Sequence, residues 1–373
     1  MIFPDKKSQD TTELLRAVLF SIRSSTPRTK FPLTKAASSD VRTGYIDGKP
    51  VRRLVVTMRA PGCSWVGRSG GCTMCGHLAG TTRGDRPSAD EFVRQFTDEI
   101  SRYDLDDISV ISIYNSGSVL NPAELDSDAL ERIMQRIKAQ PSIRKVVLES
   151  RAEYVDRSMI ETLTGILGDE RRLSIAIGLE TADNEKRRLC INKGCTRENL
   201  ETAIDTIRDI AGIQLYVLLG LPFLTEREIV DDTEATLRCA AEMGADEIHI
   251  EPATVQRHTL VELLYREGLY RLPSLYSLYE VLRRVVPDIR PYVSPFMHMP
   301  LPDLIPHGCS LCTEDLIDGL LERYNIERTP ESLSYVDCPC MDTWRERLDE
   351  TDSRPLEIRI SETLSRIARC DVV

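Results

Sequence analysis

Short apolar segments alternate with amphipathic helical segments over most of the 373 residues of the chain. The apolar segments predict six strands, at residues 52–58, 107–114, 145–149, 173–180, 213–219 and 247–251. Capping boxes at residues 88–91 and 225–228 mark two helix starts between them, and residues 121–124 are expected to cap a third helix. Such alternation predicts an α/β fold, in which a parallel sheet carries right-handed crossover helices. The pattern alone leaves a partial barrel and an open doubly wound sheet as alternatives.

A glycine-rich segment after the first predicted strand, residues 59–77, carries three cysteines: Cys63, Cys72 and Cys75. Iron–sulfur clusters held by protein alone usually take four ligands, so three thiolates would leave one iron open to another ligand. An open metal position is where chemistry occurs, and barrel enzymes keep their active sites at the carboxyl ends of the strands. The segment therefore predicts a catalytic cluster. A structural zinc site on the three cysteines and His77 is the alternative.

The cysteine segment resembles that of the radical S-adenosylmethionine (SAM) superfamily, in which three cysteines hold a [4Fe–4S] cluster and SAM chelates the fourth iron. Eight residues separate Cys63 from Cys72 where the commonest form has three, and this longer gap resembles the Elongator-like branch. Met74 stands where the superfamily usually has an aromatic residue. The segments at 114–120, 147–154, 177–183 and 251–262 are similar to that branch as well, and with the C-terminal cysteines they most resemble its archaeosine-forming lyases. The resemblance implies a partial (β/α)6 barrel.

Polar residues follow nearly every predicted strand, where a barrel enzyme would bind its ligands. The resemblance implies that a set of seven residues binds SAM: Asn115, Ser116, Gly117, Glu149, Arg151, Glu180 and Leu219. A carboxylate can bind ribose hydroxyls, and a guanidinium can bind the methionine carboxylate through two hydrogen bonds. His249, Glu251 and Gln256, at and after the sixth strand, are expected to act on the substrate. Each of these residues alone could instead be a helix cap or part of a solvated turn.

Two short cysteine pairs, Cys309 with Cys312 and Cys338 with Cys340, lie about 25 residues apart. Two such pairs can share one tetrahedral ion, so we expect a structural Zn²⁺ site here. A second iron–sulfur cluster and a metal-free segment are the alternatives. We expect the chain to divide into a basic N-terminal extension (1–50), the barrel (51–300) and a cysteine-rich module with a terminal helix (301–373).

The net charge of −11 argues against a generally nucleic-acid-binding surface. Residues 1–60 nevertheless carry twelve basic and five acidic residues, a charge of +7 that suits either a contact with RNA phosphates or a solvated extension. A chain of this size folds without disulfides, so its eleven cysteines indicate metal chemistry in a reducing cytoplasm. No signal peptide or membrane-spanning apolar run is visible, so we expect a cytoplasmic protein without a membrane partner.

The family resemblance implies a radical SAM lyase of tRNA modification. Its cluster passes an electron from an electron donor to SAM, and the 5′-deoxyadenosyl radical then abstracts hydrogen from a lysine attached to a deazaguanine base in tRNA. Cleavage of a C–N bond leaves the formamidine of archaeosine. A partner subunit related to the tRNA-guanine transglycosylases adds the lysine. The alternatives are another radical SAM tRNA-modifying enzyme and a non-catalytic, zinc-stabilised RNA-binding module.

Overall fold

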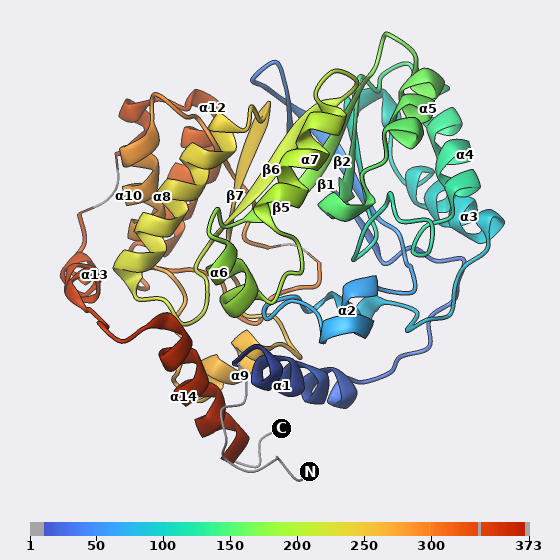
Figure 1. The fold of residues 1–373 in the computed structure, drawn as a ribbon. Helices are drawn as coiled ribbons and strands as arrows, with labels where there is room; N and C mark the ends of the chain where they lie inside the picture. The colour runs from blue at the N-terminus through green and yellow to red at the C-terminus, as the bar shows by residue number, and fades with distance from the viewer. Residues whose placement is uncertain (1–10, 298, 335–336, 370–373) are drawn as a thin grey trace.

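The computed structural model of this chain describes residues 11–297, 299–334 and 337–369, and its centre is one curved eight-stranded sheet (Figure 1). The strands are β1 (Ser38–Ile46), β2 (Lys49–Thr57), β3 (Val110–Tyr114), β4 (Lys145–Ser150), β5 (Arg172–Glu180), β6 (Gly212–Leu219), β7 (Glu247–Pro252) and β8 (Tyr292–Val293). They lie side by side in sequence order; β1 pairs antiparallel with β2, and every later pair is parallel. The predicted α/β partial barrel is therefore confirmed, with β2 to β7 as its six expected strands.

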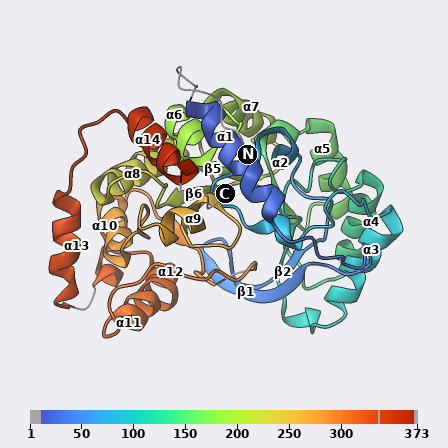
Figure 2. The same ribbon diagram turned by 90° about the horizontal axis from the view of Figure 1, so that it is seen from below.

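Helices cover the outer face of the sheet and the carboxyl ends of its strands. The helices are α1 (Thr11–Ser25), α2 (Ser64–Ser69), α3 (Ala89–Ile100), α4 (Ser127–Lys138), α5 (Arg157–Leu167), α6 (Asn184–Lys186), α7 (Arg197–Ile207), α8 (Glu226–Glu242), α9 (Leu260–Arg266), α10 (Leu275–Val285), α11 (Thr313–Asp318), α12 (Asn325–Glu327), α13 (Cys340–Asp349) and α14 (Leu356–Arg369). Figure 2 shows α3, α4, α5, α7, α8 and α10 as an arc outside the sheet. The capping boxes of α3 and α8 form as predicted. The expected cap at 121–124 is wrong, because α4 begins at Ser127 behind the N-cap Asp126.

Alternation along the strands separates an apolar outer face from a polar inner face. Successive side chains on a strand point to opposite sides of the sheet. On β4, Val146 and Leu148 are buried in the main core, while Glu149 lines an inner cavity. On β7, Ile250 is buried in that core and Glu251 lines the same cavity. The inner face of the sheet is therefore where this chain gathers its ionisable groups.

Two strands extend the sheet beyond the six that the sequence pattern predicts. β1 lies within the segment expected to be a basic extension, and it joins β2 through Asp47 and Gly48, whose φ angles are 51° and 76°. Positive φ at both central residues is what a tight hairpin turn requires. At the other edge, β8 has two residues and pairs with β7. Residues 1–10 of the expected extension lie outside the described residues.

A second apolar cluster lies beneath the carboxyl ends of the strands. It joins α1, α9 and α14, which Figure 1 shows together at the lower end of the molecule, and we call these three helices the floor. Leu15 and Leu19 of α1 are fully buried there, as is Leu364 of α14. Met74 of the cysteine segment packs against this cluster. The floor therefore supports the segment that carries the three cysteines.

The C-terminal residues continue the main core. Leu316, Leu320, Tyr324 and Trp344 are buried in the same cluster as the barrel strands, and α13 packs against α8. The terminal helix expected from the sequence is α14, which is joined to α8 through the ion pair of Arg359 with Glu228. None of the described helices is both long enough and apolar enough to cross a lipid bilayer.

Candidate active site at the carboxyl ends of the strands

The three N-terminal cysteines lie on the loop that leaves β2. Cys63 directly precedes α2, and that helix ends at Gly70, whose φ is 81°, before the loop turns through Cys72 and Cys75. Burial raises the pKa of the Cys63 thiol to about 12 and that of Cys72 to about 11, although the nearby positive charge of Arg151 lowers both. Thiols with such pKa values stay protonated at neutral pH, and binding to a metal would displace their protons.

The spacing of the sulfur atoms separates the two metal alternatives for this loop. Zinc with Zn–S bonds of about 2.3 Å holds its four ligand atoms within roughly 4 Å of one another. Cys63, Cys72, Cys75 and His77 do not form a group whose ligand atoms all lie within 4.8 Å; among the described residues only the C-terminal cysteines do. A [4Fe–4S] cluster binds each thiolate at a different iron corner, so it suits more widely spaced thiols. The described positions of these four side chains therefore do not match a single zinc ion.

One buried arginine of the floor holds the cysteine loop. The guanidinium of Arg23 in α1 donates to the carbonyl oxygens of Gly70 at 2.9 Å, Cys72 at 2.8 Å and His258 at 2.7 Å. The first two carbonyls belong to the loop, and the third lies just before α9. Because Arg23 is buried, these hydrogen bonds are shielded from water. Arg23 thus couples α1 to the backbone of a cysteine that would bind the cluster.

We expect Arg23→Met to loosen the cysteine loop without touching a cysteine. The change leaves three carbonyls without their charged donor and should lower the free energy of unfolding by roughly 2–4 kcal/mol. The variant should also lose iron to a chelator faster than the wild type. Arg28→Met, at an exposed arginine just after the same helix, is the matched control and should leave both measurements unchanged. Equal iron loss in the two variants would contradict the role of Arg23.

A buried carboxylate holds the other side of the loop. Glu124 is 1% exposed, and its side chain accepts hydrogen bonds from the backbone N–H of Ser64 at 2.8 Å and of Ser118 at 2.7 Å. The side-chain amide of Asn121 donates to it at 2.9 Å. A Cβ atom added to Gly117 would lie 2.0 Å from this carboxylate, so the close approach requires glycine. Glu124 therefore ties the start of α2 to the turn after β3.

Arg151, after β4, supplies a cation beside the thiols. Its Nε donates to Glu153 at 2.6 Å, and its guanidinium lies over the Trp65 ring, 5.2 Å from the centroid. Its Nη2 is buried without any hydrogen-bond partner among the described residues. A buried guanidinium N–H without an acceptor is costly, and an anion such as a carboxylate would satisfy it. Arg151 is thus suited to bind the methionine carboxylate of SAM, as the family resemblance implies.

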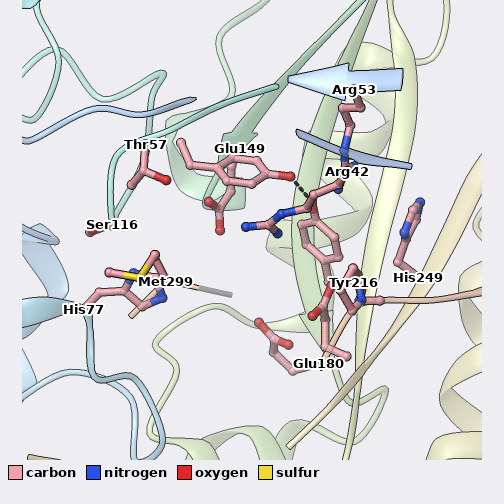
Figure 3. A pocket seen from close by; sticks show the side chains of 14 residues that line it. Arg42, Arg53, Thr57, His77, Ser116, Glu149, Glu180, Tyr216, His249 and Met299 are labelled. Carbon is pink, nitrogen blue, oxygen red and sulfur yellow. Dashed lines mark hydrogen bonds between the residues drawn. The ribbon is translucent and has the colours of Figure 1, made fainter. Parts of the chain in front are cut away.

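A cavity of about 210 Å³ opens on the inner face of the sheet beside this loop (Figure 3). The lining residues come from β1 to β7 and from the segments that follow them: Arg42, Arg53, Thr57, His77, Tyr114, Ser116, Glu149, Glu180, Tyr216, His249, Glu251, Ser294, Pro295 and Met299. The hydroxyls of Tyr114 and Tyr216 meet at 2.9 Å. The lining is therefore unusually rich in charged and hydroxyl groups for a small enclosed volume.

The wall of the cavity nearest the cysteines carries two carboxylates and a lysine. Burial raises the pKa of Glu149 to about 7, and its side chain makes no hydrogen bond to another described residue. Lys193 donates to Glu180 at 2.7 Å and to the Gly178 carbonyl at 2.7 Å. Glu180 and Ser116 both have φ of 63°, a conformation that residues other than glycine seldom adopt. Such strain is typical of residues held in place for function.

Comparison with known proteins identifies the family. Archaeosine synthase subunit beta of Methanosarcina acetivorans is 30% identical to this chain over 328 residues, which cover 86% of the chain and 92% of that protein. The Thermococcus kodakarensis protein of the same name is 27% identical over 308 residues, covering 80% of the chain and 92% of that protein. The chain belongs to the archaeosine synthase subunit beta family. The resemblance on which the sequence analysis relies is therefore confirmed.

Two solved structures show a weak similarity to this chain. Methylornithine synthase has a TM-score of 0.48 at 13% identity, over 98% of this chain and 89% of that one. Elp3 of Methanocaldococcus infernus has a TM-score of 0.42 at 15% identity, over 57% of this chain and 53% of that one. No protein-family model matches the chain. Both structural likenesses are weak, so the family assignment rests on the archaeal relatives.

The structure divides the predicted site residues of this family member into two groups. Ser116, Glu149, Glu180, His249 and Glu251 line the cavity. Asn115, Gly117, Arg151, Leu219 and Gln256 do not line it. The side chain of Asn115 is bonded within its own turn, to the Ser118 carbonyl. The backbone carbonyl of Leu219 accepts from Ala253, and the side-chain oxygen of Gln256 accepts from the N–H of Gly76 at 2.8 Å. Gln256 therefore holds the cysteine loop in this structure, and its predicted action on the substrate remains a prediction.

Several residues that shape the site carry no local signal in the sequence. Arg23, Glu124 and Lys193 reach it through contacts between distant segments. Arg42 and Arg53 lie on β1 and β2, in the part of the chain whose charges suggest an RNA contact or a solvated extension. The alternation of Arg53 with the buried Leu54 was the available sign that this arginine faces the inside of the sheet.

The four C-terminal cysteines come together as predicted. The sulfur of Cys309 lies 3.8 Å from that of Cys312 and 3.5 Å from that of Cys338. The sulfur of Cys340 lies 3.5 Å from that of Cys312 and 3.6 Å from that of Cys338. A tetrahedral ion with bonds of about 2.3 Å would hold its sulfurs about 3.8 Å apart. The Tyr276 hydroxyl lies 3.6 Å from two of these sulfurs. The geometry matches a single four-thiolate metal ion.

Proposed function

We propose that this chain is the radical SAM lyase of archaeosine formation, acting on tRNA in which a deazaguanine base carries a lysine adduct. The observation that carries the proposal is the buried Nη2 of Arg151, which has no hydrogen-bond partner among the described residues and belongs to a guanidinium whose charge acts on the thiols of Cys63 and Cys72. Membership in the archaeosine synthase subunit beta family supports the assignment of tRNA with a lysine adduct as the substrate. Both relatives are named as a subunit of archaeosine synthase.

Cys63, Cys72 and Cys75 would hold the [4Fe–4S] cluster. Arg151 would bind the methionine carboxylate of SAM, and Glu149 would bind its ribose. When bound, the cluster and SAM supply a 5′-deoxyadenosyl radical that abstracts hydrogen from the substrate. The remaining proposed SAM contacts are Asn115, Ser116, Gly117, Glu180 and Leu219.

The other ionisable groups of the cavity would position the ligands and set the charge around them. Burial raises the pKa of the Glu149 carboxyl to about 7, and a carboxyl group in its protonated form can donate to a hydroxyl as well as accept from one. Lys193 holds Glu180 in its strained conformation through the 2.7 Å ion pair. His249 and Glu251 are the proposed substrate contacts, at the opposite side of the cavity. A bound substrate that fills this small cavity would keep water away from a reactive radical.

The C-terminal thiols would bind one structural Zn²⁺. The site is built into the main core, so the ion would anchor α11 and α13 against α10. The ten described cysteines are free thiols, which suits a reducing cytoplasm. The family name implies a partner subunit, which we propose is related to the tRNA-guanine transglycosylases and delivers the modified tRNA. An external electron donor would reduce the cluster.

The test is turnover by anaerobically reconstituted full-length protein with SAM, dithionite and tRNA carrying the lysine adduct. We expect 5′-deoxyadenosine and the formamidine nucleoside to form in equal amounts, measured by mass spectrometry. SAM cleavage that leaves the lysine adduct intact would indicate a radical SAM enzyme with another tRNA substrate. Uptake of two zinc ions and no iron, without SAM cleavage, would indicate the non-catalytic RNA-binding module.

A further inference from the structure

The end of the cavity farthest from the cysteines contains a buried arginine that lacks an anion. Arg53 on β2 is 8% exposed and lines the cavity. Figure 3 shows its side chain at the upper right. Its Nε is buried without a hydrogen-bond partner, and the guanidinium makes no ion pair or hydrogen bond with any other described residue. A buried cation is normally paired, because desolvation without a partner is costly. The arginine is therefore placed to receive an anion from a ligand.

Neighbouring carboxylates do not supply that anion. Glu247, which alternation places on the same face of β7 as His249, is already bound by Lys145 and lies 3.4 Å from the His249 ring nitrogen. Its pKa falls to about 2 because the contacts with His249 and Lys145 outweigh the effect of burial. Its charge is thus engaged by two other residues of the inner face. No described carboxylate forms an ion pair or a hydrogen bond with Arg53, although the charge of Arg53 acts on Glu251.

A second arginine and an acid share this end of the cavity. Arg42 on β1 donates to both carboxylate oxygens of Asp40, one of them at 3.0 Å, and it also lines the cavity. Glu251 on β7 accepts from the Ser294 hydroxyl. Burial raises the pKa of Glu251 to about 7, and the charges of Arg42 and Arg53 act against that rise. Two cations and two carboxyl groups therefore lie close together, and Asp40 is already paired with Arg42.

The two ends of the cavity have different chemical neighbours. The charges of Glu149, Glu180 and Lys193 act on the pKa values of Cys72 and Cys75. The charge of Arg53 acts on His249, Glu251, Tyr45 and Tyr216, and the charge of Glu180 reaches Glu251 as well. The groups that act on the thiols lie at the near end, which therefore suits the cofactor, and the end lined by Arg53 suits the substrate.

We propose that the far end of the cavity binds the free α-amino-acid group of the lysine adduct, with its carboxylate on Arg53 and Arg42 and its ammonium on Glu251. This rests on the proposed function. In the proposed substrate lysine is attached to the base through its side-chain nitrogen, and cleavage of the bond from that nitrogen to carbon leaves the formamidine on the base. Its α-carboxylate and α-ammonium are then free, and a pair of arginines beside a carboxyl group complements both.

A phosphate of the tRNA backbone is the other anion that Arg53 could accept, and the substrate can be changed to tell them apart. The full-length enzyme with its cluster is given tRNA carrying either lysine or 1,5-diaminopentane, which has the same chain without the carboxylate. We expect wild type to prefer the lysine adduct by about 10- to 150-fold in kcat/KM, the range for a hydrogen bond to a charged group. Arg53→Met should lower turnover of the lysine adduct to that of the diaminopentane adduct and leave the latter nearly unchanged.

Two further measurements make the result decisive. Arg53→Met should raise the Tm of the substrate-free protein, because it removes an unpaired buried charge. Arg52→Met, at an exposed arginine one position earlier on β2, should behave as wild type in both assays.

Equal turnover of the two adducts by wild type would overturn the inference and leave the proposed function standing. A parallel loss on both adducts in Arg53→Met, or a lower Tm, would assign Arg53 to phosphate binding or to folding and overturn it too. Failure of wild type to cleave either adduct would instead refute the proposed function, and the inference with it.

Discussion

Cys72→Ala is expected to reduce the iron of the reconstituted protein from about four atoms per chain to nearly none and to abolish 5′-deoxyadenosine formation. Two remaining thiolates cannot hold a cluster that already leaves one iron to SAM. The loop itself should persist, because Arg23 donates to the backbone carbonyl of residue 72 rather than to its side chain. The loss should therefore appear in iron content and activity, with little change in the unfolding transition of the apoprotein.

Cys239→Ala is the matched control for that experiment. Cys239 is a buried cysteine of α8 and does not belong to the thiol groups of either proposed metal site. This variant should keep its iron and its activity. Full iron content in Cys72→Ala, or its loss in Cys239→Ala, would show that the cluster is not held by the predicted three cysteines.

Cys340→Ala is expected to remove one zinc ion per chain and to lower the free energy of unfolding by roughly 3–5 kcal/mol, or about 5–15 °C in Tm. The four sulfurs already lie at the spacing of one tetrahedral ion, and two of them touch the fully buried Tyr276. Loss of one thiolate would leave the ion without a complete ligand set and would release α13 from the core. Metal analysis and thermal unfolding measure the two effects.

The two cysteine variants serve as controls for each other. Cys72→Ala should lose iron and keep zinc, while Cys340→Ala should lose zinc and keep the ability to bind iron. Iron at the C-terminal thiols would replace the proposed zinc ion with a second cluster. A Tm of Cys340→Ala equal to that of wild type would show that these thiols carry no structural metal.

The strands and the metal-binding cysteines could be predicted from the sequence because their signals are local. The apolar runs from β2 to β7, the capping boxes of α3 and α8, and the spacing from Cys63 to Cys75 can all be read within a few residues. β1 had a local sign too, in the Asp47–Gly48 pair, but its polar composition resembles a solvated extension. β8 is too short for any periodic pattern.

The supporting contacts could not be predicted, because they join segments that are distant in the sequence. Glu124 lies in the segment 121–124, which was expected to cap a helix, yet its side chain accepts a hydrogen bond from the N–H of Ser64. Gln256 was expected at the substrate, and it binds the N–H of Gly76. The charge of Arg53 suggested either contact with RNA or a solvated extension, whereas the direction of its side chain depends on the register of β2 with β1 and β3.

The floor has a consequence for the order in which the protein assembles. Every strand pairs with its neighbour in the sequence, so the sheet can form through contacts of short separation. The floor instead joins α1 to α14, across nearly the whole described chain. Contacts of such separation form late, because the chain between them must be ordered first. We therefore expect a maturation stage in which the barrel is complete while the underside of the cysteine loop is still open to the machinery that delivers iron and sulfide.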